Sequence, residues 1–191
     1  YVPLGGDIQE AIDTADAGSV IKLDEGSYYP SATLDTGGKA ISIIGTTDPT
    51  TGVPNSIIDG QDSIPVLQCV NGEGEETVFK NLLITGGMAN GEFPENVGGG
   101  MRNYFSSPTL ENCVFMGNSA GIGGGMRNYE SSPTLENCRF EGNLASDQGG
   151  GMHNVSTSSP QLINCTFIGN LAGSSGGGIA NQIYSTPRIT N

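Results

Sequence analysis

Apolar and polar residues repeat along this chain with a period of about 25 residues, most regularly between residues 98 and 175. Each full copy carries three glycines followed by Met, a Ser-Ser-Pro turn, and the segment Leu-x-Asn-Cys-x-Phe-x-Gly-Asn. The copies begin 25, 26 and 27 residues apart, at Gly98, Gly123, Gly149 and Gly176. Such a period indicates a solenoid, whose units bury their apolar faces by stacking. The run of leucines that marks leucine-rich repeats is absent.

The first copy divides into three short extended segments, at residues 100–103, 108–111 and 113–116. Glycines and a Gly-Asn pair supply the turns, and proline starts an extended segment. Leu110 and Phe115 recur in every full copy, so we expect them to face inward and stack. Three strands per turn and one turn per copy predict an all-β parallel β-helix. Its aromatic stack would contain Phe115, Phe140 and Phe167.

Asn112 interrupts the strict two-residue alternation of a strand, so we predict that it bends the chain in the left-handed backbone region. Its amide would then reach its equivalent one coil away, because neighbouring parallel strands lie about 4.8 Å apart. The predicted bend ladder contains Asn81, Asn112, Asn137 and Asn164.

Three of the four cysteines occupy one position of the repeat, and Cys69 lies elsewhere. Parallel side chains about 4.8 Å apart hold the Cβ atoms too far apart for a good disulfide, and a line of thiols does not converge tetrahedrally on zinc. We therefore favour buried free thiols over a disulfide or a metal site. The predicted stack contains Cys113, Cys138 and Cys165.

The pattern GGG-[MI]-x-N…SSP-x-L-x-N-C-x-F-x-GN resembles the repeats of right-handed parallel β-helix proteins of the pectin-lyase-like superfamily. It is especially similar to the GG-[AI]…F-x-N repeats of polymorphic outer-membrane proteins and related secreted bacterial surface proteins. The match covers residues 98–191 closely and the first half more loosely. The resemblance implies a right-handed parallel β-helix in an extracellular or cell-surface location. It does not imply one activity, because the superfamily includes lyases, hydrolases, adhesins and phage tailspikes.

The chain is expected to form one domain, with residues 1–18 as an N-terminal cap, 19–97 as irregular coils and 98–191 as regular glycine-rich coils. Asp7 followed by Glu10 is typical of a helix start, and the residues after it place apolar side chains on one helical face. We expect this helix to cover the open first coil, in preference to binding a partner. Six or seven coils would give a rod about 30 Å long.

The chain has 7 Lys and Arg against 20 Asp and Glu, for a net charge of −13. This balance disfavours binding to nucleic acids and to anionic membranes, and no 18-residue apolar run is present to span a bilayer. The acidic excess favours a soluble extracellular surface over a dedicated cation site. Calcium remains possible at the acidic turns, although no EF-hand loop or related nonapeptide occurs. These acidic residues are Asp59, Asp62, Glu73, Glu75 and Glu76.

One outward column could carry chemistry: Arg102, Arg127 and His153 each follow the stacked Met of their copy. The resemblance implies that a substrate groove would run along this sheet, where Tyr104 and Tyr129 could stack on sugar rings. Acid–base cleavage also needs matched bases or paired carboxylates, and no Asp or Glu recurs here. We therefore favour surface decoration and assign no catalytic residue. The flanking column is expected to be a structural ladder of Asn103, Asn128, Asn154 and Asn181.

The fourth copy reaches Asn191, which is equivalent to the bend residue Asn112, before its third strand. We expect either a longer native chain or a second subunit to cover this open coil, and the first is favoured. The leading functional hypothesis is a non-catalytic secreted or surface-displayed structural, adhesive or assembly module. The alternative is a carbohydrate-active or glycan-binding domain that resembles polysaccharide lyases or hydrolases.

Overall fold

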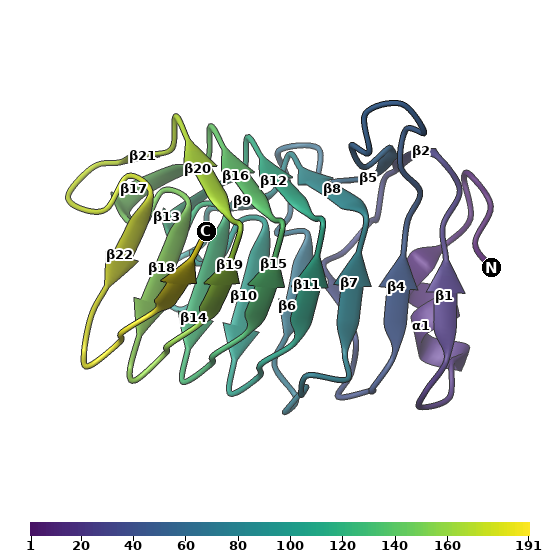
Figure 1. Ribbon diagram of the computed structural model, residues 1–191, viewed down its shortest axis with the longest axis horizontal. Coiled ribbons are helices and arrows are strands. Elements are labelled where there is room, and N and C mark those ends of the chain that lie inside the picture. Colours follow the sequence, from purple (N-terminus) through teal and green to yellow (C-terminus); the bar gives the residue numbers. More distant parts are fainter.

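The computed structural model describes all residues 1–191 and forms one stack of β-coils with a single short helix. Neighbouring strands in its sheets are parallel, and each coil lies one step farther along the long axis (Figure 1). The chain completes about six turns of a right-handed parallel β-helix, as the repeat predicted.

Four sheets run along the axis. Sheet I contains β1 (Val20–Lys22), β4 (Ser42–Ile44), β7 (Val78–Lys80), β11 (Thr109–Glu111), β15 (Thr134–Glu136), β19 (Gln161–Ile163) and β23 (Arg188–Thr190). Sheet II contains β3 (Leu34–Asp35), β6 (Leu67–Cys69), β10 (Met101–Tyr104), β14 (Met126–Tyr129), β18 (Met152–Val155) and β22 (Ile179–Asn181). Sheet III contains β2 (Gly26–Tyr28), β5 (Ser56–Asp59), β8 (Leu82–Thr85), β12 (Val114–Met116), β16 (Arg139–Glu141) and β20 (Thr166–Ile168). Sheet IV contains β9 (Met88–Ala89), β13 (Ser119–Ile122), β17 (Leu144–Gln148) and β21 (Leu171–Ala172).

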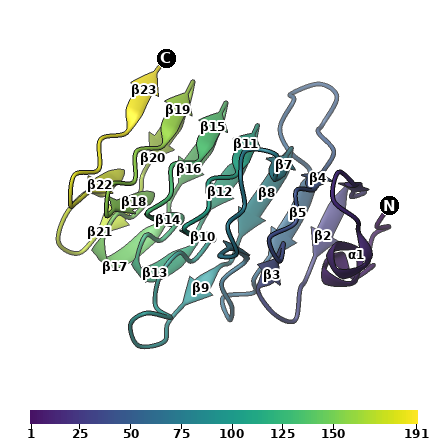
Figure 2. The same ribbon diagram turned by 90° about the horizontal axis from the view of Figure 1, so that it is seen from below.

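Sheets I, II and III are the three that the repeat predicted, whereas sheet IV was not expected. It lies beside sheet II on the C-terminal half of the stack (Figure 2). β13, β17 and β21 each follow a Gly-Asn turn, where Gly117 has a φ of 64°, and β9 follows Gly86-Gly87. They are short and contain glycine and serine, so their apolar pattern is weak. Only a column of small residues faces inward from this sheet, at Ala89, Ala120, Ala145 and Ala172.

The predicted interior stacks are confirmed. The rings of Phe115 and Phe140 lie 4.7 Å apart and within 3° of parallel, and Phe140 stacks on Phe167 in the same way. The four cysteines are free and buried. In the predicted stack each thiol lies against a backbone carbonyl of the preceding coil, as in the 3.4 Å contact of Cys113 Sγ with the oxygen of Phe79. The same side chains thus stack on one another from coil to coil through the core.

The bend residues all adopt the predicted left-handed conformation, with φ between 48° and 56°. Asn112 Nδ2 donates to Asn81 Oδ1 at 2.9 Å, and Asn164 Nδ2 donates to Asn137 Oδ1 at 3.3 Å. The continuous ladder is nevertheless wrong at one step, because no bond joins Asn112 to Asn137. The Nδ2 of Asn112 also donates a hydrogen bond to the oxygen of Gly52, in the loop between β4 and β5.

The helix α1 (Ile8–Thr14) lies at the N-terminal end of the stack (Figures 1 and 2). Asp7 accepts hydrogen bonds from the backbone nitrogens of Gln9 and Glu10, as its N-cap position predicted. β3 is the edge strand of sheet II, and the side chain of Gln9 forms hydrogen bonds with its backbone as a further strand would. Its Nε2 donates to the oxygen of Asp35 at 3.0 Å, and its Oε1 accepts from the nitrogen of Asp35 at 2.9 Å.

Candidate functional site

The outward column of sheet II brings together the three residues that the sequence singled out. Arg102 pairs with Arg127 across β10 and β14, and Arg127 pairs with His153 across β14 and β18. The column begins with Asp35 on β3 and Gln68 on β6, and it ends with Ala180 on β22. Because parallel strands lie about 4.8 Å apart, the two guanidinium side chains start one coil step from each other.

This column is not the exposed surface decoration that the sequence suggested. Arg127 is 5% exposed and His153 is 2% exposed, while Arg102 is half-buried. The glycine turn before each strand folds back over the column, with positive φ angles near 68°. A Cβ on Gly123 would lie 2.9 Å from the Cβ of Arg127, and one on Gly149 would lie 2.7 Å from that of His153. The repeated glycines therefore let the backbone enclose these side chains.

Aromatic rings cover the flat faces of the arginines. Tyr104 and Tyr129 stack with their centroids 5.0 Å apart, as neighbours on β10 and β14. The guanidinium carbon of Arg127 lies 5.4 Å from the ring of Tyr129 and 5.9 Å from that of Phe93, in the segment between β9 and β10. Arg102 lies 5.7 Å from the ring of Tyr104. Such contacts attract the cation but leave the N–H edges of the guanidinium free to bind other groups.

Neither arginine has a carboxylate partner. The two ion pairs within 4.0 Å in this protein are Lys80 with Glu111 and Arg139 with Glu141, and both lie on other sheets. The Nε atoms of Arg102 and Arg127 are enclosed without a hydrogen-bond partner. Two adjacent cations therefore lie close together and unneutralised in a chain whose net charge is −13.

Enclosure also sets the protonation of the column. Burial lowers the pKa of Arg127, and the neighbouring Arg102 lowers it further. Burial and the charge of Arg127 lower the pKa of His153 to about 4, against the opposing effects of Gln182 and Asp147. His153 is consequently neutral at pH 7, and its Nε2 lies 3.4 Å from Gln182 Oε1. The column carries the positive charge of its two arginines and no more.

A cavity of about 370 Å³ opens beside Arg102. Its walls include Gln68 and Leu67 of sheet II and the segment that follows β9, including Glu95. Gln68 is held in place by donating to Asp35 Oδ2 at 2.8 Å. The cavity thus has hydrogen-bond donors on the sheet side and a carboxylate on the opposite side.

This constellation supplies donors and aromatic walls rather than an acid–base pair. The one carboxylate of the column, Asp35, lies two strands from Arg102 and accepts a hydrogen bond from Gln68. A neutral, almost fully enclosed imidazole at His153 is poorly placed to exchange protons with a ligand. The arrangement is suited to holding a negative group.

The neighbouring inward column of sheet II is the predicted structural ladder. Its side-chain amides join in series, each Nδ2 donating at 2.8 Å to the Oδ1 of the next coil, along Asn103, Asn128, Asn154 and Asn181. The ladder starts where Cys69 occupies the same register on β6, and there Asn103 Oδ1 has no partner.

A second buried ladder is formed by the Asn of each Gly-Asn pair. The sequence predicts only a turn at this pair, so the ladder was not expected. Asn118 Nδ2 donates to Asn143 Oδ1 at 3.0 Å, and Asn143 Nδ2 donates to Asn170 Oδ1 at 2.8 Å. Each amide also donates to a carbonyl of the preceding coil, as Asn118 does to Ile84. The recurrence of Asn at this position could have indicated the ladder, because a turn alone does not require the same polar side chain in every copy.

The acidic calcium candidates do not form one cluster. Glu73 is buried and accepts hydrogen bonds from Thr36, Gly38, Asn71 and Ser106. Burial opposes its ionisation, but these bonds outweigh the effect and lower its pKa. The turn residues Asp62, Glu75 and Glu76 are exposed, and Asp59 accepts from the nitrogen of Gln61. No group of three or more His, Cys, Asp or Glu side chains is arranged to hold a metal ion.

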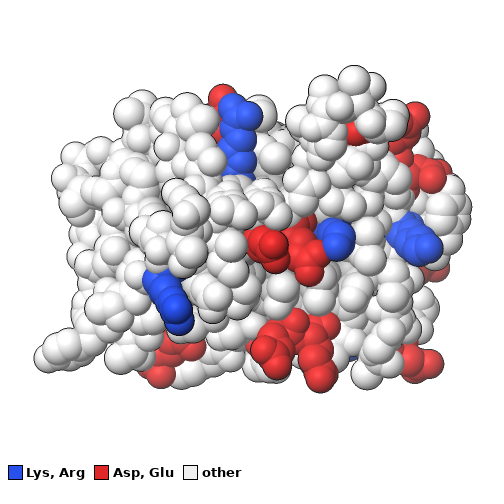
Figure 3. Space-filling model, in the orientation of Figure 1, with Lys and Arg blue, Asp and Glu red and all other residues white.

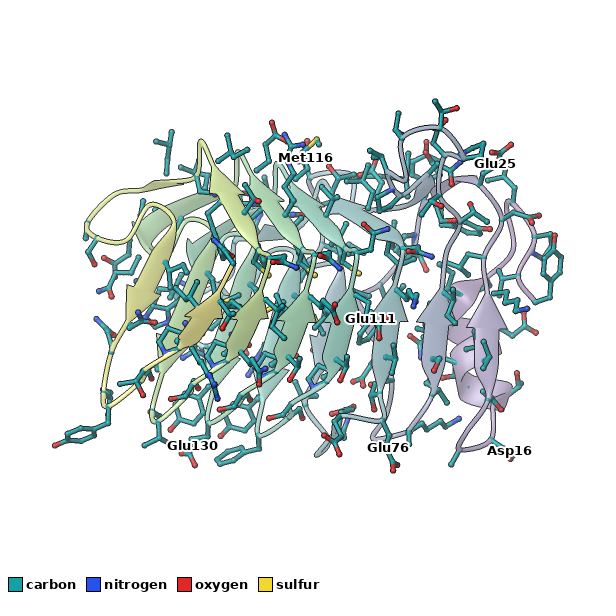
Figure 4. The ribbon with its side chains drawn as sticks, viewed as in Figure 1. Asp16, Glu25, Glu76, Glu111, Met116 and Glu130 are labelled. Carbon is teal, nitrogen blue, oxygen red and sulfur yellow. The ribbon has the colours of Figure 1, made fainter.

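The face formed by sheet I carries charges singly or in small groups rather than as one patch (Figure 3). Glu111 projects from the middle of this face, and Glu76 and Glu130 lie at turns along one edge (Figure 4). Met116 marks the sheet III edge, where it is exposed (Figure 4). None of these carboxylates forms an ion pair with Arg102 or Arg127.

The protein's only helix has seven residues, which is too short to cross a membrane. Comparison with known proteins finds no matching family model and no matching curated protein. Among solved structures, the chain is similar to a mutant pectin methylesterase in complex with a hexasaccharide, at 12% identity and a TM-score of 0.41. The similarity covers 85% of this chain and 61% of that protein. The strand pairing of the chain itself confirms the parallel β-helix that the repeats predicted, and the likeness to pectin-lyase-like proteins and to polymorphic outer-membrane repeats stays a prediction.

Proposed function

We propose that this chain is a non-catalytic structural module, secreted or displayed at a cell surface, which serves as a stiff rod in adhesion or assembly. The observation that carries the proposal is the continuous amide ladder on sheet II. Each buried amide from Asn103 to Asn154 bonds to the next coil at 2.8 Å. The buried amides of one coil find their hydrogen-bond partners only in the neighbouring coils. Bending the rod or separating two coils would therefore leave buried amides unpaired.

The last coil offers the surface through which such a rod would be extended. Ile189 stands in register with Leu162 of the leucine stack, yet it is 58% exposed. Phe167 and Ile179 end the phenylalanine and methionine stacks and are half-buried. At the opposite end α1 and Gln9 occupy the corresponding position. A second copy of the chain is the proposed occupant of this C-terminal face.

Charge on the sides of the rod complements this role. Twenty acidic residues against seven basic ones give a surface that repels like surfaces at neutral pH. Lateral association is therefore disfavoured, whereas the end face exposes mainly apolar rungs. Association along the axis is the geometry that this contrast favours.

The test is light scattering with negative-stain microscopy across protein concentration, with calcium and with chelator. We expect the unmodified chain to form end-to-end dimers through two C-terminal faces, because α1 and Gln9 cover the other end. Ile189→Lys should reduce them, whereas Val53→Lys, at a side position that is 54% exposed, should not. A monomer at every concentration would exclude self-stacking.

The non-catalytic part needs its own test. Acidic polysaccharides should remain uncleaved by the chain in a lyase and hydrolase screen. Turnover that disappears in Arg127→Gln while Arg139→Gln retains it would contradict the structural proposal. Arg139 is the suitable control because it lies on sheet III and removes the same charge.

A further inference from the structure

We propose that Arg102 and Arg127 form a binding site for the carboxylate of a small, singly charged, ring-bearing ligand. The site lies in the groove between the outward face of sheet II and the segment that links β9 to β10. This inference is independent of the structural role proposed above, because it concerns the side of the rod and not its end.

The first step concerns the buried charge. Arg127 is 95% enclosed and has no carboxylate within 4.0 Å, although the chain contains 20 acidic residues. The nearest column neighbour, Arg102, is a second cation. Buried charges are normally paired, so two adjacent unpaired arginines indicate that a negative partner is supplied from outside the chain.

The second step concerns hydrogen bonding. Guanidinium groups are donors only, so a column of arginines cannot satisfy itself as the adjacent asparagine column does. Both Nε atoms are enclosed and lack an acceptor. A carboxylate accepts two parallel N–H bonds from one guanidinium, which is the geometry that such donors prefer.

The third step concerns the rest of the ligand. The ring of Phe93 lies over Arg127 and is 65% exposed, and Tyr104 stacks on Tyr129 beside it. A flat ring attached to the carboxylate would find aromatic surface there. The cavity of about 370 Å³ that Arg102 lines has room for a molecule of one or two rings, and Arg127, Phe93 and the two tyrosines lie outside its lining.

The fourth step limits the charge of the ligand. Glu95 lines the same cavity as Arg102, and Asp35 holds Gln68 at its base. These carboxylates, with the net charge of −13, disfavour a ligand with many negative groups. One carboxylate per ligand matches the two cations and their acidic surroundings.

The experiment is a calorimetric titration of the full chain with benzoate, a monomeric hexuronate and acetate, at constant ionic strength. The first two distinguish an aromatic acid from a sugar acid, and acetate tests the charge without a ring. We expect benzoate or the hexuronate to bind saturably and at least tenfold more tightly than acetate. Equal binding of acetate would overturn the role of the ring.

Variants then place the ligand. The double variant Arg102→Gln/Arg127→Gln should lose saturable binding, whereas Arg139→Gln should retain it. Circular dichroism and thermal unfolding establish that each variant is folded. Unchanged affinity in the folded double variant, or no saturable binding of any probe to the unmodified chain, would overturn the proposal.

A second readout does not depend on variants. His153 is the chain's only histidine and neighbours Arg127, so its ring resonances report on this site without ambiguity. A bound carboxylate that neutralises Arg127 should raise the pKa of His153 from about 4. If the ligand saturates the protein and the imidazole titration does not move, the ligand binds elsewhere and the assignment fails.

Discussion

Two columns of polar residues run along sheet II, one facing inward and one facing outward. The side chains of the inward column bond to one another, whereas the arginines of the outward column do not. The inward column, from Asn103 to Asn181, links its side chains by bonds of 2.8 Å from coil to coil. The outward column holds Arg102 and Arg127 at the same spacing without a partner. An amide carries a donor and an acceptor and can stack on itself, whereas a guanidinium carries donors and a charge and cannot. Repetition thus stabilises one column and leaves the other in need of an acceptor.

The largest effect is expected from breaking the satisfied column in its middle. Asn128→Ala leaves the donor of Asn103 and the acceptor of Asn154 unpaired and buried, so unfolding should become easier by about 3–5 kcal/mol. Urea unfolding measures this change. Asn181→Ala is the control, because it removes one bond at the exposed end and should cost about 1 kcal/mol. Equal losses in the two variants would show that the ladder is not the stabilising element.

The next effect is a dependence of stability on pH through His153. Its pKa is about 4 in the fold and near 6.5 in the unfolded chain, so the unfolded state binds the proton first as pH falls. Stability should therefore fall by up to about 3 kcal/mol between pH 6.5 and pH 4. Urea unfolding of the unmodified chain and of His153→Gln isolates this contribution. Glu73 acts in a lower window, because its depressed pKa keeps its contribution until pH falls below its ordinary value of 4.5.

A smaller effect of opposite sign is expected from Arg127→Met. The substitution removes an unpaired buried charge and keeps an apolar side chain, so stability should stay equal or rise by about 1 kcal/mol. The pKa of His153 should rise in the same variant, because Arg127 is one cause of its depression. Imidazole NMR and urea unfolding check the two expectations. A loss as large as that of Asn128→Ala would mean that the arginine has a satisfied structural role.

The smallest effect belongs to an exposed charge that does have a partner. Lys80 pairs with Glu111 on sheet I, where both side chains are partly exposed. Lys80→Gln should change the free energy of unfolding by less than about 1 kcal/mol, since solvent screens such pairs. Thermal unfolding at low and high salt measures it. A change of several kcal/mol would indicate that surface charge, and not the interior ladder, dominates the stability of the rod.

The sequence predicted the parts of this fold that depend on repetition. A Phe, Cys or Asn that recurs once per coil lies next to the same residue type in the following coil. The spacing along the chain was therefore enough to predict the stacks and the left-handed bend. Sheet IV escaped prediction because its short strands bury only alanine. The additional bond of Asn112 to the loop carbonyl of Gly52, 60 residues away in sequence, also lay outside what the repeat could predict.

The candidate site was likewise predicted from the sequence only in part. The sequence by itself determined that Arg102, Arg127 and His153 share one outward column, because the repeat sets their register. Only the tertiary structure decided that this column is enclosed, because the glycine turns fold over it and Phe93 reaches it from an irregular segment. The absence of a carboxylate partner was likewise decided in three dimensions, since the chain has 20 acidic residues and none lies within 4.0 Å of either arginine. A period specifies which residues become neighbours along the axis, and the packing of segments outside the period decides what surrounds them.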